Sequence, residues 1–277
     1  MTTSRESRMT GPIKRHGGKH YLADWIVSQM PHSEHDEHYV ELFGGGLAVL
    51  LRRDPEGVSE VVNDLDGELM NFWRMLQGAD AFQEMKRRLE ATPFAEETFQ
   101  QADIADDRDD EVERALKFFI RCRQSRQGLK KDFATLSKNR TRRGMNEQVS
   151  SWLTAIDGLA EVHDRLKRVV ILTDDAVTII KREDSPNTVF YADPPYLHET
   201  RVTTSEYLHE MTDADHERLL TALSQIEGKF ILSGYRNTLY DDFADLHGWR
   251  RVDRAIDCKA SGAAQKPKRI ESLWMNY

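Results

Sequence analysis

Short apolar runs rich in β-branched and aromatic residues alternate along the chain with stretches of helical spacing. The apolar runs predict buried strands at 39–43, 58–62, 169–172, 189–192 and 229–235. Helical spacing predicts helices within 68–120, 151–167 and 213–226, the last capped by Thr212 or Asp213. Segments 249–256 and 270–276 alternate as a terminal antiparallel pair would. Strands that alternate with helices predict an open α/β sheet wrapped around an inserted helical region.

An acidic corner stiffened by proline follows the strand predicted at 189–192, with the sequence Asp193-Pro194-Pro195-Tyr196. The prolines end the strand and withhold two backbone N–H groups, which leaves the Asp193 carboxylate and backbone carbonyls as hydrogen-bond acceptors. Such a corner can accept both hydrogens of an exocyclic amino group while Tyr196 stacks on the attached ring. The corner therefore favours chemistry on a nucleobase amine, and a strand-ending turn with a capping aspartate is the alternative.

A glycine turn, Gly44-Gly45-Gly46, lies between the strand at 39–43 and a helix predicted at 47–51. Strand, glycine turn and helix in this order bring the backbone close to a dinucleotide-like cofactor. Asp64 ends the next strand about 20 residues later, where an acidic residue can bind ribose hydroxyls, although a helix N-cap is the alternative. Together these features favour a cofactor that contains adenosine.

Several polar residues are expected to meet at one edge of the sheet. Asp64, Asp175, Asp193 and the glycine turn all follow predicted strands. Because ligands of open α/β sheets bind at the carboxyl ends of the strands, we expect these residues to line one cleft. Lys19 closes a Gly-Gly-Lys segment ahead of a predicted helix, where it could meet an anion or belong to an ordinary loop.

The charge is distributed unevenly. The 277 residues have a formal net charge of −8, yet residues 121–143 carry nine basic residues against Asp132 alone. A basic surface on an acidic body predicts a footprint for a nucleic-acid phosphate backbone, and a solvated charged face is the alternative. The nine are Arg121, Arg123, Arg126, Lys130, Lys131, Lys138, Arg140, Arg142 and Arg143, of which 139–146 is the most loop-like part. A second basic patch holds Lys259, Lys266, Lys268 and Arg269.

Other features narrow the class of protein. No apolar run has the length of a membrane span, and no apolar signal core follows Arg5 and Arg8, so we expect a cytoplasmic protein, nucleoid-associated in view of its basic surface. The two cysteines, Cys122 and Cys258, lie far apart without metal-ligand spacing, which argues against structural zinc. The sequence predicts no metal site, and residues 1–12 are expected to form a flexible tail.

Taken together, the motifs resemble the Dam-like family of DNA adenine-N6 methyltransferases (D12 class, group alpha). The similarity spans nearly the whole chain: the segment from Lys14 to Lys19, the loop 41–46, Asn63-Asp64, the corner at 193–196, and 271–274 after the C-terminal basic loop. The chain departs from the family pattern at Arg15, where many members have tryptophan, and at Leu47, where many have a further glycine.

The resemblance implies a Rossmann-like methyltransferase sheet, with S-adenosylmethionine as methyl donor and duplex DNA as substrate. Residues 13–76 and 166–277 would form the catalytic domain, and 77–165 an inserted, helical and basic target-recognition domain. The protein is expected to be a monomer or a weak dimer. The expected catalytic residues are Asp193, Pro194 and Tyr196. The expected cofactor contacts are Arg15, Lys19, Glu41, Phe43, Gly45, Asp64, Asp175 and Asp193. The expected DNA contacts are the nine basic residues of 121–143 with Lys266 and Lys268.

The expected reaction begins when the target adenine leaves the stack of the duplex and enters the cleft. Tyr196 would stack on the base, while Asp193 and the Pro194 carbonyl accept the two N6 hydrogens and aim the nitrogen lone pair at the methyl group. Segment 198–211, with Arg201 and Tyr207, is a candidate lid or DNA-contacting loop. The alternatives are cytosine-N4 methylation, amine methylation on RNA or protein glutamine, and a DNA-binding module without catalytic activity.

Overall fold

The structure is a computed structural model that describes residues 9–15, 18–31, 37–103, 106, 108–134, 136, 139–197, 210–257 and 268–277. The chain divides into two compact units. The helical unit comprises Met1–Gln29, Gly45–Asp54 and Gly67–Ile171, and the sheet unit comprises Met30–Gly44, Pro55–Asp66 and Leu172–Tyr277. Each unit is formed from segments that are separated in the sequence, so neither could be cut out as one continuous piece.

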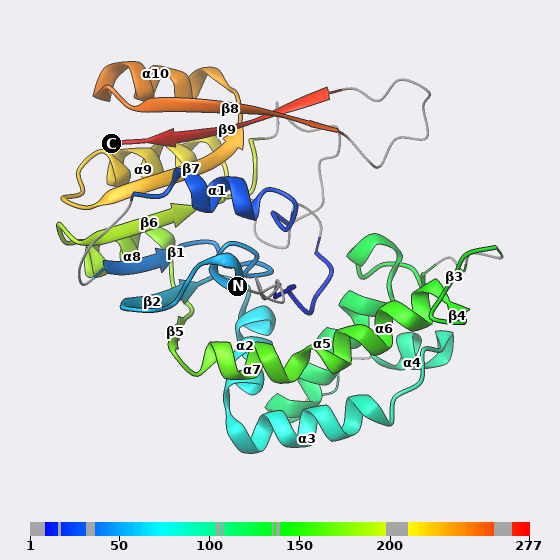
Figure 1. Cartoon of the computed structure of the whole chain (residues 1–277). Helices are drawn as coiled ribbons and strands as arrows, with labels where there is room; N and C mark the ends of the chain where they lie inside the picture. The colour runs from blue at the N-terminus through cyan, green and yellow to red at the C-terminus, as the bar shows by residue number, and fades with distance from the viewer. Residues whose placement is uncertain are drawn as a thin grey trace, which may run out of the picture. The chain divides into compact units, whose positions relative to one another are not determined.

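The structure contains a seven-stranded sheet with the strand order β5-β2-β1-β6-β7-β9-β8 (Figure 1). Six of its strands lie in the sheet unit, and β5 is shared, because the helical unit ends at Ile171. The pairs β1–β2, β1–β6 and β6–β7 are parallel, and β9 is antiparallel to both β7 and β8. The expected fold class, an α/β protein with a mainly parallel sheet, is confirmed. The strands are β1 (Glu37–Glu41), β2 (Val58–Asn63), β5 (Val169–Leu172), β6 (Thr188–Ala192), β7 (Lys229–Tyr235), β8 (Arg250–Asp257) and β9 (Lys268–Met275).

The direction of winding reverses at the middle of the sheet. From β1 the chain moves outward through β2 to β5, and it then returns to place β6 on the other side of β1. In open parallel sheets, a crevice for ligands forms at such a switch point, outside the carboxyl ends of the two strands. The carboxyl ends of β1 and β6 are therefore the expected position of a site.

One face of the sheet is covered by α8 (Ala176–Glu183), α9 (Asp213–Leu223) and α10 (Thr238–His247). Alternate residues of the central strands, among them Phe190 and Leu232, join these helices in one buried apolar cluster. Thr212 caps α9 through a capping box with Asp215, which confirms the expected start of that helix. Burial of this face explains why the central strands are visible in the sequence as short apolar runs.

The helical unit contains most of the helices and a short two-stranded sheet. Its core is aromatic, with the Phe72 ring stacked 5.8 Å from Phe119, which in turn lies 5.4 Å from Trp152. The elements are α1 (Ala23–Gln29), η1 (Leu50–Arg52), α2 (Gly67–Gln77), α3 (Ala79–Glu90), α4 (Glu96–Gln101), α5 (Glu111–Gln124), η2 (Arg126–Gly128), β3 (Thr141–Arg142), β4 (Met145–Asn146), α6 (Glu147–Asp157) and α7 (Leu159–Leu166).

Two local predictions were wrong. Residues 47–51 do not form a helix but a turn followed by η1, because Leu47 adopts φ +53°, which interrupts helical geometry. Residues 139–146 are not simply a loop, since β3 and β4 pair there as an antiparallel hairpin. The hairpin is joined by Arg143 and Gly144 at φ +57° and +74°, the left-handed pair that two-residue hairpin turns require.

The helical unit is larger than the insert expected at 77–165, since it also holds α2, whose Phe72 packs into the aromatic core. Whether 77–165 acts as a separate target-recognition domain stays a prediction. Among the residues that the structure describes, no helix has the length and apolarity to cross a membrane.

Candidate functional site

The acidic corner leaves the sheet directly after β6, a central strand that pairs with β1 and β7. The Leu42 amide donates to the Tyr191 carbonyl at 2.9 Å, so the pairing of β1 with β6 continues to the last residues before the corner. Pro194 is buried, while Asp193 and Tyr196 are half-buried and so remain within reach of a ligand. The corner lies at the carboxyl end of a central strand, as its sequence predicted, and the strand order places it at the switch point of the sheet.

Asn63 joins three strand ends at this edge. This residue is 1% exposed, and its Nδ2 donates to the Leu42 carbonyl at 3.1 Å and to the Asp174 carbonyl at 2.9 Å. Its Oδ1 accepts from the Asp174 amide at 2.9 Å, and its carbonyl accepts from Gly44 at 2.7 Å. One side-chain amide therefore connects the ends of β1, β2 and β5 and holds the first glycine of the turn.

Asp64 and Asp175, two expected cofactor contacts at this edge of the sheet, differ in the hydrogen bonds that their carboxylates accept. Asp64 is half-buried, and its Oδ1 accepts from the Asp66 amide at 3.0 Å. Asp175 caps α8, with Oδ1 accepting from the Val177 and Thr178 amides, and its Oδ2 accepts from Arg218 at 2.7 Å. Both oxygens of Asp175 are thus used within the fold, so the structure gives this residue a capping role.

A buried polar layer lies next to the corner. Glu41 and Tyr191 are partners in the β1–β6 register, and Glu41 accepts from the Tyr39 hydroxyl at 3.0 Å. The hydroxyl of Tyr191 is buried and has no hydrogen-bond partner among the described residues. Burial raises the pKa of Tyr191 well above its usual value, and the charges of Asp193 and Glu41 raise it further. An orphaned donor beside two carboxylates fits a polar ligand with a positively charged end.

Tyr196 is held by its hydroxyl as well as by the backbone of the corner. The hydroxyl donates to Glu271 at 2.6 Å, and the ring lies 4.5 Å from the ring of Tyr235. Burial raises the pKa of Tyr196 well above its usual value, and Asp193 and Glu271 add to the shift. The phenol is therefore a protonated hydrogen-bond donor at every physiological pH.

The remaining expected cofactor residues divide between the units. Phe43, half-buried, packs against the apolar cluster of the sheet unit. In the helical unit, Lys19 is 5% exposed and Arg15 is half-buried. Gly45 adopts φ +49°, and its carbonyl accepts from the indole of Trp73 at 3.2 Å. Leu47 is fully buried with φ +53°, a left-handed conformation that is strained for leucine and that glycine adopts freely.

The expected DNA contacts fall into two groups by burial. Arg123 is 9% exposed and donates to the carbonyl and the hydroxyl of Ser151, and burial lowers its pKa to about 10. Arg121 pairs with Asp103 at 2.8 Å, and Lys130 lies 3.9 Å from the centre of the Phe118 ring. These three serve the packing of the helical unit. The exposed residues are Arg126, Lys131, Arg140, Arg142 and Arg143.

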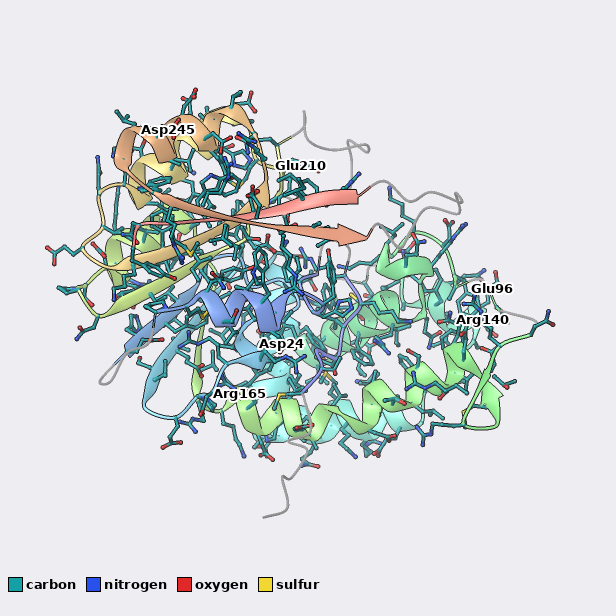
Figure 2. The ribbon with its side chains drawn as sticks, turned by 45° about the horizontal axis from the view of Figure 1, so that its top comes forward. Asp24, Glu96, Arg140, Arg165, Glu210 and Asp245 are labelled. Atoms are coloured by element: carbon teal, nitrogen blue, oxygen red, sulfur yellow. The ribbon has the colours of Figure 1, made fainter. Side chains whose placement is uncertain are left out.

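Three of the five exposed residues lie at the β3–β4 hairpin. Arg142 and Arg143 belong to the hairpin, and Arg140 directly precedes it. Figure 2 shows Arg140 at the far end of the helical unit from Arg165. The hairpin thus presents positive charge on a rigid, two-stranded support. Lys138, Lys259, Lys266 and the candidate lid residues Arg201 and Tyr207 lie outside the described residues, as does the side chain of Lys268.

Three residues of this site escaped the sequence analysis. Asn63 was read only as the neighbour of Asp64, Tyr191 as one apolar residue of a strand, and Glu271 as part of a resemblance without a role. For Asn63, the available signal was a polar residue directly after the buried pair Val61 and Val62, because such a residue must find partners once it is buried. Glu271 carried no such signal, since its strand mixes polar and apolar residues. In the described part of the chain, no three His, Cys, Asp or Glu side chains are grouped to hold a metal ion.

Comparison with known proteins supplies the family. A solved SAM-dependent methyltransferase from Agrobacterium tumefaciens is 12% identical; the match covers 100% of this chain and 66% of that one, with a TM-score of 0.42, too low to support an argument. None of the curated proteins matches the chain. The family model described as "D12 class N6 adenine-specific DNA methyltransferase" matches residues 16–253. This match confirms the family expected from the motifs, and the chain belongs to the D12 class N6 adenine-specific DNA methyltransferases.

Proposed function

We propose that this chain transfers a methyl group from S-adenosylmethionine to N6 of an adenine that has been flipped out of duplex DNA. Membership of the family implies the methyl donor and a DNA substrate. The observation that carries the proposal is the position of Asp193-Pro194-Pro195-Tyr196 at the carboxyl end of β6, beside the switch point of the sheet. An acceptor-only corner at this edge suits the amino group of a base better than any other group of DNA.

The residues around the corner fit S-adenosylmethionine by their chemistry. Asp64, half-buried at the end of β2, can hold ribose hydroxyls, and the carboxylates of Glu41 and Asp193 suit a ligand with a cationic end. The orphaned hydroxyl of Tyr191 would gain a partner from the same ligand. When bound, S-adenosylmethionine supplies an electrophilic methyl group on a sulfonium.

The corner would act on the base by positioning and by charge. The Asp193 carboxylate and the Pro194 carbonyl accept the two N6 hydrogens, which turns the nitrogen lone pair away from ring conjugation. Flipping the base costs a few kcal/mol. Stacking on an aromatic ring contributes about 1 to 3 kcal/mol per base, so Tyr196 can offset much of that cost.

The exposed basic residues at the β3–β4 hairpin would bind the phosphate backbone. Three exposed cations at this hairpin, with Arg126 and Lys131 earlier in the chain, stand on a chain whose net charge is −8, so their local field is what attracts DNA. We assign the footprint to the exposed group and not to Arg121, Arg123 and Lys130, whose side chains are buried or half-buried. Of the exposed group, Arg143 bonds Thr154 at 3.2 Å and Arg140 lies 3.9 Å from Glu147, both at the surface.

Replacing Asp193 by Asn tests the catalytic assignment. We expect methyl transfer to fall by at least about 100-fold, because a charged acceptor at the reacting nitrogen is lost, while DNA binding persists. The control is Asp184→Asn. Asp184 lies near the opposite end of the same strand, where its carboxylate accepts from the Glu227 and Gly228 amides. Wild-type methylation by the Asp193 variant would refute the assignment.

Mass analysis of nucleosides from the methylated DNA identifies the target atom. N6-methyladenine supports the proposal, and N4-methylcytosine would instead support the cytosine alternative, since the same corner can hold that amine. Methylation of RNA or protein in place of duplex DNA would refute it. A wild type that binds DNA but neither binds S-adenosylmethionine nor methylates would be a binding module.

The salt dependence of DNA binding tests the footprint. Each phosphate contact contributes about 0.9 to the slope of log K against log salt, so Arg142→Ala should lower that slope by about 1 for every DNA sequence. Arg182→Ala is the control, because this exposed arginine of α8 already pairs with Glu183. Equal slopes for wild type and the Arg142 variant would remove this residue from the footprint.

A further inference from the structure

Glu271 is a carboxylate inside the C-terminal strand β9, and it is only 1% exposed. In the register of β7 with β9 it lies opposite Tyr235. Its Oε1 accepts from the hydroxyl of Tyr196 at 2.6 Å and from the hydroxyl of Ser233 at 2.8 Å. A residue 75 positions along the chain from Tyr196 thus supplies the acceptor for the tyrosine of the acidic corner.

The bond between Tyr196 and Glu271 has the length of a strong one. Hydroxyl-to-carboxylate bonds are about 2.5 to 2.7 Å long and roughly twice as strong as bonds between neutral groups. The donor stays protonated, because burial, Asp193 and Glu271 all raise the pKa of Tyr196. Ser233, fully buried on β7, fixes the same oxygen from a second side. The carboxylate is therefore a well-anchored acceptor.

The ring of Tyr196 is consequently restrained at both ends. The two prolines fix the backbone before it, and Glu271 holds the hydroxyl at the far end of the ring. The Tyr235 ring lies 4.5 Å away at an angle of 57°, and its own hydroxyl accepts from Arg269 at 3.2 Å. A phenylalanine at 196 would have the same stacking face but would lack the restraint at the hydroxyl.

We propose that Glu271 is a positioning residue for methyl transfer: through the Tyr196 hydroxyl it sets the plane on which the flipped adenine stacks. This inference rests on the proposed function and names a residue for the same site. A ring that is already oriented loses little rotational freedom when the base arrives, so the base is held more closely to one geometry. The restraint should act on the chemical step more than on DNA affinity.

The experiment compares wild type, Tyr196→Phe, Glu271→Gln, the double variant and the control Thr188→Val. Glutamine keeps an acceptor oxygen for both hydroxyls, so the fold is retained while the charge that strengthens the bond is lost. The control loses a buried hydroxyl as well, since Thr188 donates to the Glu183 carbonyl at 2.7 Å at the first residue of β6, the end of that strand opposite to the corner. Its stability loss should match that of the Tyr196 variant.

We expect Tyr196→Phe and Glu271→Gln each to lower kcat by about 5- to 10-fold, with KM for DNA changed by less than about 2-fold. The double variant should be no slower than Tyr196→Phe, because both changes break one restraint. Thr188→Val should retain kcat within about 2-fold. With 2-aminopurine as the target base, the Tyr196 and Glu271 variants should share one altered fluorescence of the flipped base, and the control should not show it.

The inference would be overturned if the rate losses of the two single variants multiplied in the double variant. It would also be overturned if Tyr196→Phe were as fast as the control Thr188→Val. Both outcomes presuppose an active wild type, so they remove the inference and leave the proposed function intact. A wild type that methylates no DNA would instead remove the proposed function and the inference with it.

Discussion

Asn63 offers a direct test of how the candidate site is held together. Replacing it by Leu keeps the approximate size of the side chain but removes three hydrogen bonds, two donated to the Leu42 and Asp174 carbonyls and one accepted from the Asp174 amide. Leu42 is fully buried, so the loss at its carbonyl should cost about 2 kcal/mol. Asp174 is half-buried, and each of its two groups should cost about 1 kcal/mol.

The expected total is a loss of about 4 kcal/mol in the free energy of unfolding, a large part of the stability of an ordinary domain. Urea denaturation measures this loss. Hydrogen exchange should be faster at the Gly44 and Asp174 amides, because Asn63 no longer ties the strand ends together. Calorimetry should show S-adenosylmethionine binding weakened by about tenfold or more, which corresponds to about 1.4 kcal/mol.

Gln77→Met is the matched control for Asn63→Leu. Gln77 also donates its side-chain amide to two backbone carbonyls, those of Leu166 at 2.8 Å and Val169 at 2.6 Å, but it belongs to α2 in the helical unit. This variant should lose stability and keep its affinity for S-adenosylmethionine. If Asn63→Leu unfolds within about 0.5 kcal/mol of wild type, or binds the cofactor equally well, Asn63 does not organise the site.

Two further predictions concern the helical unit. Gly128→Ala should lose more than about 2 kcal/mol of stability, because φ is +74° and the new Cβ would lie 2.5 Å from the Lys14 carbonyl oxygen. Gly144→Ala is the control: it has the same φ in open space and should lose only about 1 kcal/mol. Equal losses of the two variants in urea denaturation would contradict this prediction. Burial and Arg123 lower the pKa of Lys14 from 10.5 to about 8. Between pH 8 and 10.5 the unfolded chain therefore still binds this proton while the folded protein has lost it, so the stability of wild type rises over that range. Lys14→Met should therefore be more stable than wild type by about 1 kcal/mol at pH 7, after allowance for solvent screening. Thermal melts at a series of pH values should show this gain disappear above about pH 10.5. A gain that does not change with pH would contradict the assignment to Lys14.

Much of the sheet was predictable because its signals are local. The apolar run at 229–235 corresponds to β7 residue for residue, and the runs at 169–172 and 189–192 correspond closely to β5 and β6. The two prolines after Asp193 had to end a central strand whatever surrounds it. The basic excess of 121–143 was visible too, but which of its side chains face inward was not, since burial depends on the neighbours that each residue meets.

The sequence by itself determined the α/β class, the family motifs and the acidic corner, because strand propensity, proline and glycine act on their own neighbourhood in the chain. Only the tertiary structure decided that Asn63 ties three strand ends together and that Glu271 holds the hydroxyl of Tyr196. It also decided that Leu47 stands in a left-handed conformation and that Arg123 is buried. Each of these depends on contacts between residues distant in sequence, which the fold alone brings within bonding distance.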